Sequence, residues 1–278
     1  MIKPYAAWVL HGSRKRLMAS RRVALALPFY ASVDFADAAM NTLLRQDYDN
    51  YKIFAVSDGA RPELLKIIQA WEQVYPEKIQ IFEQENMGTG GALNTAFDAI
   101  NREGGYDYGT MVSADNLYKP RFVSTLVDAL DRESDDIVMV YGDFIYVNQH
   151  DAMIHGPMVH EDLGREHLVD EYKVGPAFMF RMWAKNKAGP YWRRICEDYA
   201  NAVLIGQFGQ FKAVNEMLME YRLSLGQLTG SDPVEERRAL AYCQRLARKL
   251  YFCEDSRPED VYPPGVDPFM HRFDHEGY

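Results

Sequence analysis

The chain is poor in cysteine and has no long apolar run. Its three cysteines, Cys196, Cys243 and Cys253, form no CxxC pair. This pattern argues against a zinc site and a disulfide framework, and it fits a reducing compartment. No apolar stretch approaches the roughly 18 residues that span a bilayer, and residues 1–10 lack the layout of a signal peptide. We therefore expect a cytoplasmic protein, with peripheral association at a membrane surface left open.

Positive charge is also scarce. The net charge is -9 and the pI is about 5.3. A non-specific nucleic-acid binder is disfavoured, because such a protein needs a positive surface to release counterions. Basic residues do gather near the start of the chain, at Arg14, Lys15, Arg16, Arg21 and Arg22. Such a run is usually a solvated surface, and contact with an anionic acceptor or a membrane is the alternative.

Two nucleotide-binding signatures are missing. No GxxxxGK[ST] sequence occurs, which excludes a Walker phosphate loop. The run Gly88-Thr89-Gly90-Gly91 has Leu93 where the third glycine of GxGxxG belongs, and it follows the third predicted strand instead of the first. A Rossmann oxidoreductase is therefore disfavoured. The run is either a close approach of backbone to a ligand at a helix N-terminus or a plain tight turn.

Strand and helix patterns alternate through the first half of the chain. Short apolar runs predict strands, and apolar residues spaced three or four apart predict helices. The predicted strands are residues 23–27, 51–56, 78–82, 110–112 and 137–147, and the predicted helices are residues 33–46, 62–74, 88–100 and 121–130. This order predicts an α/β fold with a mainly parallel central sheet flanked by helices.

The second half is less regular. Residues 151–173 are typical of a loop over a site. The histidines in and beside this stretch match no metal-ligand spacing; they are His150, His155, His160 and His167. Residues 197–205 and 233–252 predict helices, and the rest is proline-rich and irregular. We predict a basic extension at 1–21, a main domain at 22–225, and a helical then irregular tail at 226–278 packed on it.

Two carboxylates follow predicted strands, at the edge where a doubly wound sheet binds its ligands. Asp58 follows the second strand, and Asp115 follows the fourth. A metal-bridged diphosphate fits Asp115, because hard cations take oxygen ligands. A helix-capping Asp-Asn turn is the alternative for Asp115, and a turn former is the alternative for Asp58.

A series of short motifs runs from Val23 to about Arg222. In chain order they are Leu27-Pro28-Phe29-Tyr30, Leu44-Arg45-Gln46-Asp47-Tyr48, Val56-Ser57-Asp58-Gly59, Asn86-Met87-Gly88, Ala92-Leu93-Asn94, Val112-Ser113-Ala114-Asp115-Asn116, the segment Lys173 to Arg181, and Cys196-Glu197-Asp198. They resemble the P-x-Y, L-x-Q-x-Y, V-D-D-G, N-x-G, A-x-N, D-x-D, G-x-x-x-x-x-R and x-E-D motifs of the inverting family 2 glycosyltransferases. The resemblance implies a GT-A (nucleotide-diphospho-sugar transferase) fold over residues 22–225.

The resemblance also implies roles for individual residues. The donor nucleotide would be bound by Pro28, Phe29, Tyr30, Asp58, Asn86, Gly88, Ala114, Asp115 and Arg222. Tyr30 would lie against the base, and Asp58 would accept its imide proton, which favours a UDP-sugar donor. Asp115 would bind Mn²⁺ or Mg²⁺ bridging the phosphates. Asp198 would be the general base of a single inverting displacement, with Glu197 orienting the acceptor or the base.

Structural alternatives stand beside these roles. Tyr30 could be a core aromatic, Glu197 and Asp198 could complement a helix dipole, and Arg222 could lie on the surface, although a mobile segment could also bring it to the diphosphate.

Departures from the motifs leave other functions open. Ser57 and Ser113 replace acids of D-D-G and D-x-D, which leaves the metal site one carboxylate short. A catalytically silent nucleotide-sugar-binding protein is therefore an alternative function. A sugar nucleotidyltransferase is less favoured, because no G-x-G-T-R-like loop follows the first strand. The sugar, the acceptor and the oligomeric state have no signature in the sequence.

Overall fold

The computed structural model describes residues 20–193, 195–223 and 233–252. Within these ranges one nine-stranded sheet has the order β3-β2-β1-β4-β8-β6-β9-β5, with β7 paired to β6 outside this row. The strands are β1 (Val23–Phe29), β2 (Tyr51–Asp58), β3 (Ile79–Gln84), β4 (Tyr108–Met111), β5 (Leu117–Tyr118), β6 (Ile137–Val147), β7 (Met153–Met158), β8 (Phe178–Arg181) and β9 (Gln210–Arg222). The helices are α1 (Val33–Leu44), α2 (Pro62–Val74), α3 (Gly88–Glu103), α4 (Phe122–Arg132), α5 (Met182–Ala188), α6 (Glu197–Ile205) and α7 (Pro233–Phe252), with 3-10 turns η1 (Glu166–Val169) and η2 (Gly206–Phe208).

The predicted alternation of strands and helices is confirmed from β1 to β6, with small shifts at element ends, except that the two-residue strand β5 was not predicted. Strands β1, β2, β3 and β4 pair in parallel, as predicted. Beyond β4 the sheet is mixed, because β8 runs antiparallel to both β4 and β6 while β9 runs parallel to β6. The prediction of a loop over residues 151–173 is wrong at β7, which forms an exposed antiparallel ribbon with the end of β6.

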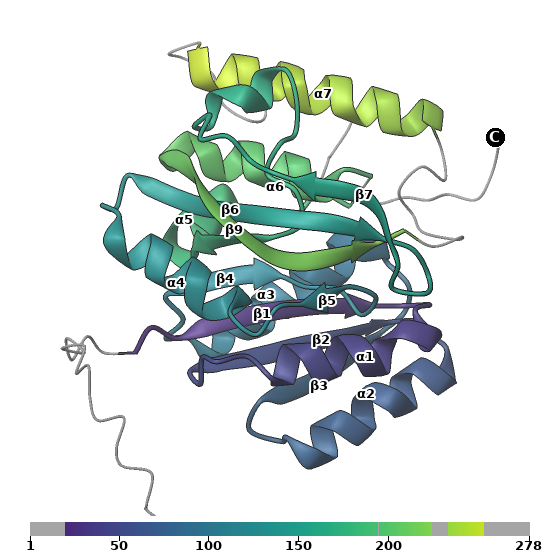
Figure 1. Cartoon of the computed structure of the whole chain (residues 1–278). Coiled ribbons are helices and arrows are strands. Elements are labelled where there is room, and N and C mark those ends of the chain that lie inside the picture. Colours follow the sequence, from purple (N-terminus) through teal and green to yellow (C-terminus); the bar gives the residue numbers. More distant parts are fainter. Residues whose placement is uncertain (1–19, 194, 224–232, 253–278) are drawn as a thin grey trace, which may run out of the picture.

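The sheet lies between two layers of helices (Figure 1). Alternate residues of β1 point to opposite faces: Val23, Leu25 and Leu27 pack with α1, α2 and α4, whereas Ala24 and Ala26 pack with α3 and α6. Small alanines on the second face allow α3 to lie close to the strands. Helix α7 covers α6 through a buried stripe, as its amphipathic pattern predicts; the stripe is Ala239, Cys243, Leu246 and Ala247. The boundaries of the main domain and the tail remain predictions.

Two arginines of the basic cluster anchor the start of β1. Arg21 forms ion pairs with Asp107 at 3.3 Å and Asp131 at 2.9 Å, and Arg22 pairs with Glu103. Arg14, Lys15 and Arg16 of that cluster, and residues 253–278 of the predicted tail, lie outside the described residues. Within the described ranges, no helix has the length and apolar character needed to cross a bilayer.

Candidate functional site

The predicted donor residues meet at one edge of the sheet. Strand β1 lies between β2 and β4 and runs parallel to both, so their carboxyl ends face the same way. Tyr30 follows β1, Asp58 ends β2, and Asp115 follows β4. The arrowheads of β1 and β2 in Figure 1 point to this edge. The topology therefore brings together three side chains that are far apart in the chain.

The motif at the end of β1 divides into a buried part and an exposed part. Phe29 is 3% exposed and belongs to the core on the α1 side of the sheet. Pro28 is partly buried within the strand. Tyr30 is 52% exposed, which excludes the core alternative for this ring. A nucleotide base can therefore lie against Tyr30, while Phe29 offers a ligand its backbone and not its ring.

The Asp58 carboxylate is held by hydrogen bonds at the end of β2. It is 4% exposed. Its Oδ1 accepts from the Met87 backbone N–H at 2.8 Å and from Gln84 Nε2 at 2.7 Å. Gln84 is itself fixed, because its Oε1 accepts from Thr95 Oγ1 at 2.5 Å. These donors set the orientation of the carboxylate. Both of these hydrogen bonds to Asp58 end on Oδ1, so neither of them occupies Oδ2.

Two glycines fold the backbone tightly beside Asp58. Gly59 has φ +66°, and a Cβ there would lie 3.2 Å from the backbone nitrogen of Asn86. Gly88 has φ +74°, and its N–H donates to Asn86 Oδ1 at 3.0 Å. A side chain at either glycine would be strained. The predicted N-x-G motif thus forms the turn into α3, with the Asn86 side chain exposed at the site edge.

Asp115 lies in a turn closed by its own neighbours. Ser113 Oγ donates to Asp115 Oδ1 at 2.5 Å, and Asn116 Nδ2 donates to Ser113 Oγ at 2.9 Å. The serine that replaces the first acid of D-x-D therefore joins the other two side chains. Ala114 is buried beneath the turn, at 3% exposure. The helix-capping alternative is excluded, because α4 begins only at Phe122.

Arg222 corrects the expectation of a mobile or surface arginine. It ends β9 and is 1% exposed. Its Nε donates to the Asp115 carbonyl at 2.8 Å and its Nη1 to the Asn148 carbonyl at 2.9 Å, and Nη1 also pairs with Asp151 at 2.5 Å. Its backbone N–H donates to Asn116 Oδ1 at 2.9 Å. Carbonyl oxygens and a carboxylate compensate the buried charge. Arg222 therefore supports the Asp115 turn from within the fold.

The acid pair, Glu197 and Asp198, opens α6. Burial raises the pKa of Glu197, and the neighbouring charge of Asp198 raises it further. Burial also raises the pKa of Asp198, opposed by the Tyr199 backbone N–H at 2.7 Å and by a hydrogen bond from Tyr172. Both acids lie in the first turn of α6, where the Tyr199 N–H bond is the contact expected from a helix N-terminus, so the helix-dipole role stands beside the raised pKa values. A carboxylate with raised proton affinity is suited to take a proton.

The segment before the acid pair is docked on α3. We call it the acid-pair loop (residues 189–193 and 195–196). Asn94 Oδ1 accepts from the Tyr191 backbone N–H at 2.6 Å, and Asn94 Nδ2 donates to the Tyr191 carbonyl at 3.0 Å. A Cβ on Gly90 would lie 1.9 Å from the Trp192 carbonyl oxygen. Cys196, with φ 66°, then turns the chain into α6. The acid pair is thus fixed to the helix that starts at the donor edge.

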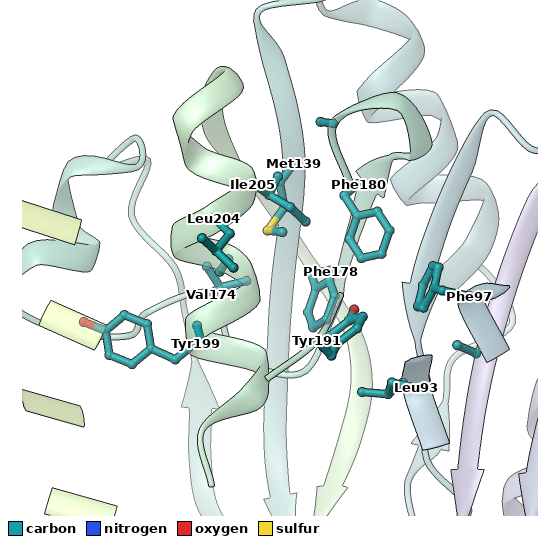
Figure 2. Close-up of a cluster of buried hydrophobic side chains, with 14 of the residues drawn as sticks. Leu93, Phe97, Met139, Val174, Phe178, Phe180, Tyr191, Tyr199, Leu204 and Ile205 are labelled. Atoms are coloured by element: carbon teal, nitrogen blue, oxygen red, sulfur yellow. The ribbon is translucent and has the colours of Figure 1, made fainter. Parts of the chain in front are cut away.

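Tyr191 and Trp192 were not predicted as site residues. They are 0% and 6% exposed, and the Tyr191 hydroxyl and Trp192 Nε1 have no hydrogen-bond partner among the described residues. Figure 2 shows Tyr191 beside Phe178, near Leu93 and Phe97 of α3. The signal in the sequence was the aromatic pair directly after Gly189-Pro190. Nothing in the neighbouring sequence indicated that this aromatic pair would contact α3.

The histidines do not form a metal centre. His160 Nδ1 lies 3.2 Å from Asp143 Oδ1, and burial lowers the pKa of His160 despite this neighbour. Burial also lowers the pKa of His167, while His150 and His155 are exposed. Across the described ranges, no group of three His, Cys, Asp or Glu side chains is arranged to hold a metal.

Comparison with known sequences gives one family. The family model described as Glycosyl transferase family 2 matches residues 25–199. An uncharacterized glycosyltransferase of Nostoc sp. (strain PCC 7120) is 24% identical over 228 residues, which cover 73% of this chain and 65% of that protein. One of Rickettsia conorii is 29% identical over 129 residues, which cover 46% of this chain and 20% of that protein. The chain thus spans less than two thirds of either relative.

Comparison with solved structures confirms the predicted GT-A fold. S. aureus TarS 1–349 in complex with UDP-GlcNAc has a TM-score of 0.65 at 13% identity, covering 86% of this chain and 69% of that chain. Mannosyltransferase PcManGT from Pyrobaculum calidifontis, in complex with GDP-Man and Mn²⁺, has a TM-score of 0.55 at 15% identity, covering 84% and 74%. At these identities the likeness concerns the fold alone.

Proposed function

Because its residues 25–199 match the family model, this chain belongs to glycosyl transferase family 2, and we propose that it transfers a sugar from a UDP-linked donor to an acceptor hydroxyl with inversion. One observation carries the proposal. Tyr30, Asp58 and Asp115 share a sheet edge, and the acid pair is docked beside it through α3. A sugar nucleotide needs a base contact, charge compensation at the diphosphate and a proton acceptor, and this arrangement offers all of them.

The donor base would be recognised by Tyr30 and Asp58. The exposed Tyr30 ring offers a flat apolar face, and Asp58 is an acceptor whose orientation is fixed by Met87 and Gln84. Uracil presents an imide N–H to such an acceptor, whereas cytosine does not. The UDP-GlcNAc complex of TarS supports this choice. Guanine also carries N–H donors, and PcManGT binds GDP-Man, so GDP-sugars are the competing donor class.

A divalent cation fits Asp115. The groups present there are the Asp115 carboxylate and the Ser113 hydroxyl, which are hard oxygen donors of the kind that Mg²⁺ and Mn²⁺ prefer. Asp115 would hold the cation together with the donor phosphates. When bound, the cation offsets the negative charge that gathers on the leaving diphosphate. Arg222 keeps the turn that carries Asp115 in place.

The chemical step would be a single displacement with Asp198 as general base. The acceptor oxygen forms a bond to the anomeric carbon while the bond from that carbon to the diphosphate oxygen breaks. Asp198 takes the hydroxyl proton, and the nucleoside diphosphate leaves with the bonding electrons. Attack from the opposite face inverts the anomeric configuration. Glu197, adjacent to Asp198, would orient the acceptor or the base.

The test begins with binding. A thermal-shift panel of UDP, GDP and their sugars with Mn²⁺ should select a UDP-sugar, because a ligand that binds the native state raises its stability. The selected donor is then assayed for hydrolysis and transfer, with the anomeric configuration of the product read by NMR. Asp198→Asn should keep donor binding and lose turnover. Asp115→Ala should lose metal-dependent binding.

Three outcomes would contradict the proposal. Nucleotide-sugar binding without hydrolysis or transfer in the wild type would favour a silent binding protein. Formation of a sugar nucleotide from a nucleoside triphosphate and a sugar phosphate would favour a nucleotidyltransferase. Retention of configuration would exclude the single displacement.

We also expect a cytoplasmic location, because the cysteines described, Cys196 and Cys243, are free thiols; cell fractionation checks this.

A further inference from the structure

Helix α3 carries two adjacent polar residues that serve different ends of the candidate site. Asn94 bonds to both backbone polar groups of Tyr191, in the loop that leads to Asp198. Thr95 donates to Gln84, which in turn donates to Asp58. Consecutive residues of a helix point about 100° apart, so one turn of α3 reaches both groups. Thr95 lies outside the motifs of the family resemblance, and Asn94, although it ends the A-x-N motif, was given no role in the site.

We propose that α3 is the positioning element of this active site: Asn94 sets the acid pair, and Thr95 sets Asp58. Both are positioning residues, because they act through Tyr191 and Gln84 and not on the substrate. This inference rests on the proposed function for its kinetic consequences. Its structural consequences do not depend on that function.

The Asn94 contact fixes the acid-pair loop in two ways. Its amide pairs with the N–H and the carbonyl of one residue, as a neighbouring strand would, at 2.6 and 3.0 Å. One turn earlier, Gly90 lets the Trp192 carbonyl pack against the helix backbone, where a Cβ would lie at 1.9 Å. The Tyr191 ring also lies 5.5 Å from the Phe97 ring. Residues 191 and 192 therefore cannot shift without breaking contacts to α3.

The strained turn at Cys196 passes this constraint to the acid pair. Cys196 has φ 66° and ψ 33°, a left-handed conformation that costs a non-glycine residue about 1 kcal/mol or more. Such a conformation persists when the flanking segments are held. The flanks here are the docked loop on one side and α6 on the other. The direction in which Asp198 points thus depends on the loop being anchored at Asn94.

The Thr95 contact acts on the donor side. Its hydroxyl donates to Gln84 Oε1 at 2.5 Å, which leaves Gln84 Nε2 to donate to Asp58 Oδ1 at 2.7 Å. Without Thr95, the Gln84 amide can rotate, and Asp58 loses one of its two oriented donors. The Met87 N–H would remain. Loss of Thr95 should therefore weaken base recognition and leave the acid pair in place.

The helix is rigid enough to link the two ends. Its inner face is buried in the core, with Ala92, Leu93, Ala96 and Phe97 all at 4% exposure or less. Substitutions at Asn94 and Thr95 should leave this packing in place, since neither side chain is among the fully buried residues of α3. A change at one residue should thus affect one end of the site. This separation makes the inference testable.

The experiment compares Asn94→Ala with Thr95→Val in the full chain. Asn94→Ala should lower kcat about 10-fold to 100-fold while the donor KM and the affinity for UDP stay within about twofold, because misplacing a catalytic group costs turnover more than binding. Thr95→Val should raise the donor KM and the Kd for UDP about five- to tenfold, as expected for one oriented hydrogen bond, with kcat nearly unchanged. Asn94→Asp, which keeps an acceptor for the Tyr191 N–H, should recover part of the lost turnover.

A matched control is Thr125→Val on α4. The Thr125 hydroxyl is buried and has no partner among the described residues, so this change removes a hydroxyl without breaking a bond. It should leave kcat, KM and UDP affinity as in the wild type.

The acidic limb of the pH–rate profile adds a readout that a merely structural role would not move. Asn94→Ala should shift that limb to lower pH, because a loosened loop exposes the acid pair to water and lowers its pKa.

Hydrogen–deuterium exchange separates failure of this inference from failure of the proposed function. Asn94→Ala should speed exchange at residues 190–193 and 195–199 and leave exchange at residues 57–61 and 84–88 unchanged. Thr95→Val should speed exchange at residues 57–61 and 84–88 and leave exchange at residues 190–193 and 195–199 unchanged. Equal effects at both places, or equal losses of kcat and UDP affinity in both variants, would overturn the inference. Absence of nucleotide binding by the wild type would overturn the proposed function while the exchange pattern still decided the positioning role.

Discussion

The two halves of the sheet hold their carboxylates in opposite ways. In the parallel half, β3-β2-β1-β4, Asp58 accepts from Met87 and Gln84, and Asp115 accepts from Ser113. In the mixed half, the acid pair opens α6, where burial raises the pKa of both carboxyl groups. Hydrogen bonds therefore orient the carboxylates of the first half, whereas burial favours uptake of a proton in the second.

This difference teaches how one fold separates binding from proton transfer. In the proposed function, a residue that orients a base or a cation needs a fixed direction, which oriented donors provide. A general base must instead gain and lose a proton near the working pH, which burial favours by raising the pKa. The proposed division places the two kinds of acid on different elements and joins those elements through α3. Each prediction below tests this division.

The largest expected effect is on turnover. Asp198→Asn should lower kcat by about 10²- to 10⁴-fold, because asparagine cannot accept the hydroxyl proton, and UDP affinity should persist. Asp58→Asn is the matched change in the other half and should raise the Kd for UDP while sparing kcat. Steady-state kinetics and calorimetry measure both. Parallel losses of kcat and affinity in both variants would mean that the two acids do not have separate tasks.

The next effect is on stability. Arg222→Ala should lower the free energy of unfolding by about 2–4 kcal/mol, the order expected when several hydrogen bonds to one charged group are lost, because Asp115, Asn148 and Asp151 all lose a donor. The exposed pair of Arg132 with Asp128 is the control. Arg132→Ala should change the free energy by less than about 1 kcal/mol. Urea unfolding measures the stability of both variants. Equal losses of stability would show that the buried contacts of Arg222 contribute no more than an exposed ion pair does.

A smaller effect concerns the join between α3 and the acid-pair loop. Gly90→Ala should cost about 1–3 kcal/mol, because the new Cβ would lie 1.9 Å from a backbone oxygen that cannot move freely. Gly156→Ala is the control, since nothing lies within 4 Å of a Cβ there. Thermal unfolding followed by calorimetry compares the two. A Gly90 variant as stable as its control would mean that the loop is not packed against the helix.

The smallest effect is a pH dependence of stability. The pKa of Glu197 is raised in the folded state, so its contribution to stability is present at low pH and is lost as pH rises through that raised pKa. Glu197→Gln, which stays neutral, should therefore be more stable than the wild type at pH 9, with a smaller difference at pH 5. A difference independent of pH would show that Glu197 is ionised at little cost.

The sequence predicted the parallel half well, because its signals are local. Apolar runs gave the strands, and Asp58 and Asp115 stood directly after two of them. The mixed half was harder. Polar and apolar residues alternate at both ends of β9, but Val214-Asn215 breaks the alternation in the middle, and the strand was not predicted. The bonds between Asn94 and Tyr191 join residues 97 positions apart, and no local pattern can indicate such a contact.

Arg222 shows a different limit. An isolated arginine after a tyrosine is ordinarily expected at the surface. Its burial is possible because backbone carbonyls from two distant turns accept its N–H groups. The order of side-chain types along the sequence cannot show which backbone carbonyls will lie near an arginine. The acid pair, by contrast, was visible as a short motif, while the reason for its raised pKa, burial at the start of α6, emerged only from the fold.

The anchoring of β1 by Arg21 and Arg22 has a practical consequence. These ion pairs hold the chain at the amino edge of the sheet, and β1 then runs about 20 Å, at roughly 3.3 Å per residue, to the opposite edge where Tyr30 lies. An affinity handle fused directly ahead of Ser20 would start at the edge of the sheet opposite the proposed donor site. Immobilisation on a sensor chip through that handle should therefore preserve nucleotide capture.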